Sequence, residues 1–217
     1  MRHLFLQGIP EFSGFQLTHC GRTYSVDIET VTACSGRVKS QVKKDPSNLD
    51  LELPPIPGLF DLIVLWIYGM KPPINSENCL FVYAMADFLE IGDLRSQAGK
   101  VSKETATIVN CIDRAEFVAA YDINFTQPFD LLLGNLNECI RLLRMIGISE
   151  GVLKILWERV DPKSNEARIL GELFEDLLEI NPNKYKNIVA FFDFDRFREK
   201  LNMVTRNFEL LEDRSTG

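Results

Sequence analysis

The part of the sequence that most constrains the fold is residues 59–94. Nine of its first eleven residues are apolar, and a run of about three helical turns favours a helix. After two prolines, apolar residues recur at helical spacing over 80–91, behind Asn75 or Ser76, either of which can cap a helix N-terminus. The two runs predict a pair of helices: the first is a buried apolar helix with Trp66 in the core, and the second must be covered on most sides.

Short alternating patterns precede this region. Apolar and polar residues alternate over 15–19 and again over 24–28, on either side of Gly21, which predicts a β-hairpin with one buried face. A weak and interrupted helical pattern follows over 31–42. Residues 49–53 alternate again and predict a third strand, which ends at two prolines because proline cannot donate to the ladder.

Beyond residue 100 the sequence has only helical patterns. The clearest is an i, i+3, i+4, i+7, i+8 stripe of apolar residues that runs from Leu170 to Leu178. Five helices are predicted, near residues 104–121, 129–146, 149–160, 165–180 and 183–201. The predicted fold class is therefore α+β: a short three-stranded sheet with helices over residues 1–100, a boundary near 99–103, and an all-α region over 101–217.

Composition and charge disfavour several classes of function. A net charge of −7 and a pI near 5.0 argue against a nucleic-acid partner, because phosphate backbones attract basic surfaces. Five irregularly spaced cysteines and two histidines give no disulfide or zinc pattern, and no glycine-rich phosphate loop occurs. The apolar runs are too short for a signal peptide or for the roughly 20 residues of a membrane span. We expect no cofactor, metal, nucleic acid or membrane, and a cytoplasmic or nuclear protein that is not secreted.

Thiol chemistry is the enzymatic alternative. His19 and Cys20 are neighbours in a predicted strand, so their side chains should point to opposite faces and form no catalytic pair. Cys34 and Cys111 remain as nucleophiles of a small intracellular thiol-dependent enzyme, against the simpler interpretation that both are buried structural thiols. The aspartates of 193–195 have the spacing of a metal clamp, but residues i and i+2 of a helix lie about 200° apart, which disfavours joint coordination.

A set of residues within 15–98 has the order and spacing of a known signature. They are Tyr24, Ala33-Cys34-Ser35, Phe60, Trp66-Ile67-Tyr68, Ile74, Glu77-Asn78, Ala86-Asp87-Phe88-Leu89, Ile91 and Leu94. With the order of hairpin, helices, one more strand and a helical hairpin, this stretch resembles the BTB/POZ domain family, as a divergent, protist-like member. The resemblance implies a protein–protein interaction module with no chemistry of its own. Residues 101–217 take the place of the family's BACK-like helical region.

The resemblance also bears on partners. Gly14 and Asp27 stand where dimeric relatives carry an aspartate and a histidine of a charged pocket. Residues 42–45 lack the glutamate of the apolar-x-Glu motif that cullin-binding relatives often carry. The resemblance implies a non-enzymatic adaptor that binds other proteins, including a second copy of itself or a cullin; a cullin-type ubiquitin-ligase adaptor is the alternative within this class.

The candidate partner-binding residues are apolar side chains of the N-terminal segment and of the helical region after the hairpin. They are Leu4, Phe5, Leu6, Ile9, Phe12, Val38 and Val42. Burying a large apolar side chain is worth roughly 1.5–3 kcal/mol, so the five in residues 4–12 are costly to leave in water. Two interpretations stay open: the segment packs back onto its own domain, or it contacts a partner.

Overall fold

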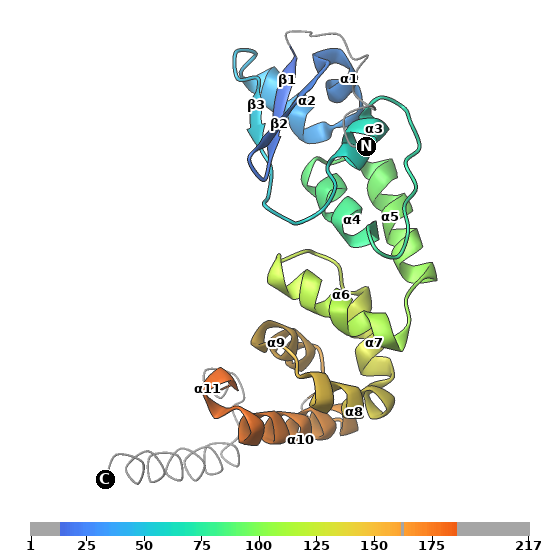
Figure 1. The fold of residues 1–217 in the computed structure, drawn as a ribbon, viewed down its shortest axis with the longest axis vertical. Helices are drawn as coiled ribbons and strands as arrows, with labels where there is room; N and C mark the ends of the chain where they lie inside the picture. Colours follow the sequence, from blue (N-terminus) through green and yellow to red (C-terminus); the bar gives the residue numbers. More distant parts are fainter. Residues whose placement is uncertain (1–13, 162, 186–217) are drawn as a thin grey trace, which may run out of the picture. The chain divides into compact units, whose positions relative to one another are not determined.

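The computed structural model describes residues 14–161 and 163–185 (Figure 1). The chain forms two compact units, divided between Ala106 and Thr107. The first is α+β, and the described part of the second is helical, in agreement with the predicted fold class. The boundary expected at residues 99–103 falls inside helix α5 (Gly92–Glu104), which the sequence patterns did not reveal.

The N-terminal unit contains a three-stranded sheet in the order β2-β1-β3. Its strands are β1 (Phe15–His19), β2 (Arg22–Val26) and β3 (Asp50–Glu52). β1 pairs antiparallel with β2 and parallel with β3, and Leu17 lies opposite both Tyr24 and Leu51. Phe15, Leu17 and His19 are buried, so one face of β1 points into the core, as the alternation predicted.

The second strand ends two residues earlier than predicted, at Val26. Asp27 instead begins helix α1, because its carboxylate accepts the Thr30 backbone N–H at 2.8 Å and the Thr30 hydroxyl at 2.7 Å. These are the bonds of a helix N-cap. The alternation that the sequence continues to Ile28 therefore does not correspond to strand.

Five helices complete the described part of this unit. They are α1 (Ile28–Cys34), α2 (Gly36–Lys44), α3 (Asp61–Ile67), α4 (Cys79–Phe88) and α5 (Gly92–Glu104).

The interruption predicted within 31–42 is Ser35, which ends α1 and begins α2. Its hydroxyl accepts the Val38 N–H at 3.2 Å and donates to the Leu89 carbonyl at 2.6 Å, which attaches this junction to the end of α4. α4 packs along α5 (Figure 1).

Aromatic rings form the centre of this core. Phe60 is fully buried, stacks on His19 with ring centroids 5.4 Å apart, and meets Tyr24 edge-on at 5.1 Å. His19 Nε2 lies 2.8 Å from the Ile56 carbonyl, so the buried imidazole has a hydrogen-bond partner. Trp66 was expected in the core and is instead only half-buried, because a different side of α3 faces inward.

The described part of the C-terminal unit is a set of packed helices. They are α6 (Ile108–Ala120), α7 (Gln127–Gly134), α8 (Leu136–Ile146), α9 (Glu150–Glu158), α10 (Asn165–Ile180) and α11 (Pro182–Tyr185). α6 packs against α7 and α9, and α8 packs against α10. The hydroxyls of Thr107, Ser149 and Ser164 cap α6, α9 and α10, each accepting the backbone N–H three residues along.

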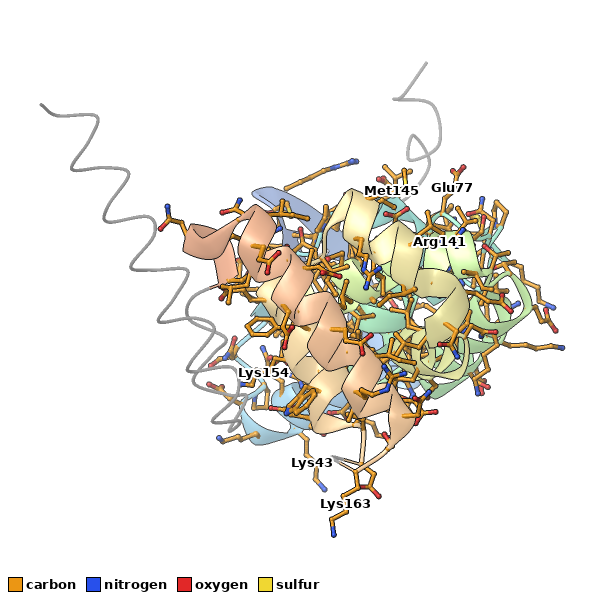
Figure 2. All side chains as sticks on the ribbon, turned by 90° about the horizontal axis from the view of Figure 1, so that it is seen from below. Lys43, Glu77, Arg141, Met145, Lys154 and Lys163 are labelled. Atoms are coloured by element: carbon orange, nitrogen blue, oxygen red, sulfur yellow. The ribbon has the colours of Figure 1, made fainter. Side chains whose placement is uncertain are left out.

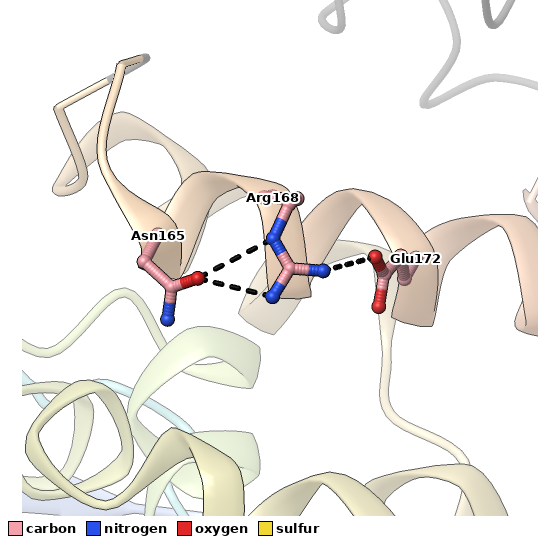
Figure 3. A network of polar contacts seen from close by, with 3 residues as sticks. All are labelled: Asn165, Arg168 and Glu172. Carbon is pink, nitrogen blue, oxygen red and sulfur yellow. Dashed lines mark hydrogen bonds and ion pairs between the residues drawn. The ribbon is translucent and has the colours of Figure 1, made fainter.

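Helix α10 shows how these helices divide into two sides. The stripe predicted from Leu170 to Leu178 is buried. On the exposed side, the Arg168 guanidinium lies between Asn165, whose side-chain oxygen is 3.0 Å from Nη2, and the carboxylate of Glu172 (Figure 3). The sequence pattern therefore identified the buried side of this helix correctly.

Two other predictions for this unit need revision. The helix predicted over 129–146 is two helices, α7 and α8, separated at Asn135, whose φ of −125° and ψ of 28° leave the helical path. Of the helix predicted over 183–201, only residues up to Tyr185 fall within the described part. Among the described residues, no helix combines the length and the apolar character needed to cross a membrane.

Candidate functional site

Helix α3 is apolar on more than one side, but only one side is buried. Its inward residues are Ile63, Val64 and Ile67. Successive residues of an α-helix are about 100° apart, so Leu62 and Leu65 lie on the opposite side, and both are partly exposed. A helix that packs only on its own domain normally carries polar residues at such positions.

Residues at both ends of α3 extend this exposed side. Leu59 is 66% exposed and Met70 is 54% exposed. Gly69, at φ 74°, reverses the chain after the helix, and the Met70 N–H donates to the Leu65 carbonyl at 3.0 Å. This helix-terminating motif brings the two bonded residues together, so Met70 is held beside Leu65. Together we call these residues the α3 outer face: Leu59, Leu62, Leu65, Trp66 and Met70.

A polar group borders the α3 outer face at the start of the helix. The Asp61 carboxylate lies 3.3 Å from Arg22 Nη1 on β2 and accepts the Tyr24 hydroxyl at 3.5 Å. The Arg22 guanidinium lies over the Tyr24 ring, 4.6 Å from its centroid. Burial, followed by the charge of Asp61, raises the pKa of Tyr24, so the phenol stays protonated at neutral pH. An apolar area with a polar border is typical of protein-binding surfaces.

The described chain begins near the other end of α3. Phe15 pairs with Val26 in the sheet, and the following Asp27 donates its N–H to the Tyr68 hydroxyl at 3.1 Å. The chain before residue 14 therefore starts close to the C-terminal end of α3.

The predicted partner-binding residues fall into three groups. The five in the N-terminal segment lie outside the described residues: Leu4, Phe5, Leu6, Ile9 and Phe12. Val42 is half-buried on α2. The prediction that Val38 binds a partner is corrected. Val38 is fully buried beside the Ser35 cap, so its side chain belongs to the core and is not accessible to a partner.

Sequence reasoning missed the α3 outer face, although its signal was present. A run with nine apolar residues out of eleven was interpreted as a buried helix with Trp66 in the core. A helical projection places Leu62 and Leu65 opposite Ile63, Val64 and Ile67, but it does not reveal which side the rest of the chain covers. That choice depends on contacts with α1 and α4.

The two cysteines considered as nucleophiles have raised pKa values. Burial raises the pKa of Cys34, and burial with a smaller contribution from Cys139 raises the pKa of Cys111 to about 11. The thiolate is the nucleophilic form, and at neutral pH these shifts keep both groups protonated. Neither thiol therefore has the lowered pKa of an activated nucleophile, and of the two only Cys111 is buried.

Cys20 lies closer to His19 than the sequence analysis expected. Its Sγ is 3.6 Å from His19 Nε2, because Cys20 follows the strand in a turn with φ 49°. Nε2 also lies 2.8 Å from the Ile56 carbonyl, which can only accept a hydrogen bond. Nε2 therefore donates its own hydrogen to that carbonyl and cannot take one from Cys20, so the contact is not a thiol–base pair.

The described residues, 14–161 and 163–185, contain no group of three or more His, Cys, Asp or Glu side chains that could hold a metal ion. The aspartates of 193–195 lie outside these ranges.

Comparison with known proteins found no family model that matches the chain and no significant match among curated proteins.

Proposed function

We propose that this chain is a non-enzymatic protein–protein interaction module of the BTB/POZ type. The α3 outer face carries the proposal, because Leu59 and Met70 are exposed and Leu62, Leu65 and Trp66 are partly exposed. Monomeric proteins rarely leave contiguous apolar residues uncovered, and such patches mark binding surfaces. The mechanism is apolar burial, without covalent chemistry.

The expected energy of this contact is appreciable. Burying a fully exposed Leu or Met side chain is worth about 1.5–3 kcal/mol, so Leu59 and Met70 contribute most of the energy and the partly covered Leu62 and Leu65 contribute less. A stable interface buries about 800 Å² on each partner, which is more than one short helix presents. The N-terminal segment starts near the same helix, and we propose that residues 4–12 extend the contact area.

The order of elements in the N-terminal unit supports the family resemblance. A hairpin, two helices, a third strand and further helices follow one another as in the BTB/POZ plan. Phe60, one of the matching positions, lies at the centre of the core. Under this proposal, the helices of the C-terminal unit correspond to the BACK-like region.

Two local features favour apolar contact over the charged pocket of dimeric relatives. The Asp27 carboxylate caps α1 and is occupied by Thr30. A Cβ atom added at Gly14 would lie 2.4 Å from the Val26 carbonyl oxygen, so an aspartate cannot stand there without movement of the backbone. The proposed partner is another protein, with a second copy of this chain or a cullin as the two specific candidates.

Substitution of Leu65 by Asp tests the proposal. The charge would sit in the middle of the α3 outer face, and the matched control is Val109→Asp at a position 72% exposed on α6. Solution mass measured over a range of concentrations reports self-association, and titration with the N-terminal domain of a cullin reports the adaptor function. We expect Leu65→Asp to weaken whichever association the parent protein shows and Val109→Asp to leave it unchanged. An unchanged association in Leu65→Asp would contradict the proposal.

Deletion of residues 1–12 tests the part assigned to the N-terminal segment. Under the interface interpretation, partner binding is lost while the melting temperature stays nearly unchanged. A sharp fall in melting temperature would show that the segment belongs to the core. Its residues would then be withdrawn from the proposed interface, and the test of Leu65 would be unaffected.

A further inference from the structure

Helix α2 carries a cluster of exposed lysines. Lys39, Lys43 and Lys44 are all exposed, and α2 contains no acidic residue. Lys39 and Lys43 are four residues apart, so they lie on the same side of the helix, and Lys44 adjoins them. Figure 2 shows the Lys43 side chain projecting away from the ribbon. We call these three lysines the α2 basic face.

The α2 basic face has no ion-pair partner within the described part of the chain. Seven ion pairs join other basic residues to carboxylates there, for example Lys100 to Glu104 at 3.7 Å. Lysines in the last turn of a helix complement its dipole, which accounts for Lys43 and Lys44 but not for Lys39. Like charges four residues apart also repel, so Lys39 and Lys43 together destabilise the isolated helix. External carboxylates would offset that repulsion.

The acidic residue that follows α2 directly is engaged elsewhere. The Asp45 carboxylate accepts the Ser47 hydroxyl at 2.6 Å and the Ser47 backbone N–H at 3.0 Å. These two bonds lower the pKa of Asp45, so the carboxylate stays ionised while the following loop holds it. It forms no ion pair with the α2 basic face, and the lysines stay open to another anion.

Side-chain hydrogen bonds hold α2 in place near both ends. The Ser35 hydroxyl, which caps its N-terminus, also donates to the Leu89 carbonyl at the end of α4. Near its C-terminus, the Gln41 amide donates to the Asp50 carbonyl at 2.9 Å and so attaches the helix to β3. A helix fixed in this way loses little freedom when it binds, which lowers the entropic cost of a contact.

The surroundings of these lysines favour a polypeptide over other anions. Val42 is partly exposed, three residues after Lys39 and next to Lys43, so an apolar side chain lies among the charges. A peptide can offer carboxylates to the lysines and an apolar side chain to Val42, whereas a phosphate backbone offers charge alone. The net charge of −7 also opposes the approach of long polyanions.

We propose that the α2 basic face binds an acidic segment of a partner protein, with Asp and Glu carboxylates paired to Lys39, Lys43 and Lys44. The contact is electrostatic, so it weakens as the salt concentration rises. This surface belongs to a different helix from the α3 outer face and does not depend on the function proposed for that face.

Fluorescence anisotropy with the full chain tests this proposal. The probe is a labelled peptide with Glu residues on both sides of a central Leu, and the same peptide with Gln in place of Glu should not bind. The test variant combines Lys39→Gln, Lys43→Gln and Lys44→Gln. The control variant has the same net charge and combines Lys71→Gln, Lys103→Gln and Lys163→Gln, at exposed positions elsewhere in the chain.

The two variants should differ clearly. Exposed ion pairs are individually weak, so the loss of three should weaken peptide binding by about tenfold in the test variant. Binding to the control variant should stay close to that of the parent. Equal weakening in both variants, or no binding of the Glu peptide by the parent, would overturn the proposal.

A second set of measurements separates charge from folding and from other ligands. A variant that combines Lys39→Arg, Lys43→Arg and Lys44→Arg keeps the charge and should keep the binding; a loss as large as that of the Gln variant would contradict the electrostatic contact. A single-stranded oligonucleotide or phosphatidylserine vesicles that bind the parent as tightly as the peptide, through the same lysines, would overturn the choice of a protein partner. Leu65→Asp should bind the peptide as the parent does, which distinguishes this surface from the α3 outer face.

Discussion

Helices α3 and α4 have similarly apolar sequences, but the chain covers them to different extents. In α4, seven of ten residues are buried, and the helix packs on α5 and α3. In α3, three of seven residues are buried. The apolar content of α4 is thus explained by its neighbours in the fold, whereas that of α3 exceeds what its own domain uses.

This difference separates two roles of an apolar helix. A fully apolar sequence predicts that a helix is covered, but it does not indicate whether the cover comes from the same chain. For α4 the cover is intramolecular. For α3 the residues described here leave Leu62 and Leu65 partly exposed, which motivates the proposal of a partner.

The largest effect is expected at Phe60, on the inward side of this region. Phe60→Ala removes a fully buried ring from its contacts with His19 and Tyr24 and should lower the free energy of unfolding by about 3–5 kcal/mol. The matched control is its neighbour Leu59, 66% exposed, where substitution by Ala should change that free energy by less than about 0.5 kcal/mol. Urea unfolding measures both. Equal losses in free energy of unfolding for Phe60→Ala and Leu59→Ala would contradict the distinction between a buried inward side and an exposed outer face.

Ser35→Ala should have the next largest effect. Ser35 both caps α2 and donates to the Leu89 carbonyl, so its loss removes a cap and leaves a buried acceptor unpaired, at a cost of about 2 kcal/mol. Ser149→Ala removes only a cap, from α9, and should cost about 1 kcal/mol. If the two substitutions lower the free energy of unfolding equally in urea, the hydrogen bond from Ser35 to the Leu89 carbonyl contributes nothing to stability.

Trp66→Ala sharpens the comparison at the margin of the α3 outer face. Truncating a fully buried aromatic side chain to Ala lowers the free energy of unfolding by about 3–5 kcal/mol. Because Trp66 is partly exposed, we expect a smaller loss of about 1.5 kcal/mol. The loss in free energy of unfolding for Trp66→Ala should fall between the losses for Phe60→Ala and Leu59→Ala. A loss as large as that for Phe60→Ala would place Trp66 in the core after all.

The smallest expected effect is a pH dependence at Asp27. The Thr30 hydroxyl, and then the Thr30 backbone N–H, lower the pKa of Asp27 from its usual value of 3.8. A lowered pKa means that this cap stabilises fully above the unfolded-state value, and the stabilisation is lost as the pH falls through the lower folded-state value. Asp27→Asn should therefore flatten the pH dependence of unfolding below about pH 4. A pH profile that stays parallel to that of the parent would contradict this.

Elements with strong local patterns could be predicted from the sequence. The hairpin alternates with period two, and the α10 stripe from Leu170 to Leu178 has helical spacing, so each indicates its own buried side. Helix α5 was missed because glycines at 92 and 99 weaken its helical signal. The split at Asn135 was missed because the apolar spacing continues through the break.

The candidate site could be predicted only in part. The sequence indicated an apolar helix over 59–69, but the side of α3 that faces outward depends on contacts with elements distant in the sequence. The burial of Val38 has the same origin, since the Ser35 junction is attached to α4 through Leu89. Local spacing gives the sides of a helix, and tertiary contacts decide which side is buried.

The central claim is that the α3 outer face serves binding and is not needed for folding. Affinity capture on parent protein and on Leu65→Asp, carried out side by side with urea unfolding of both, tests it most directly. We predict that a partner is retained by the parent and lost by Leu65→Asp, while Leu65→Asp lowers the free energy of unfolding by no more than the roughly 1.5 kcal/mol expected for the similarly exposed Trp66. Retention of the same partner by Leu65→Asp, or a loss of several kcal/mol in its stability, would contradict the claim.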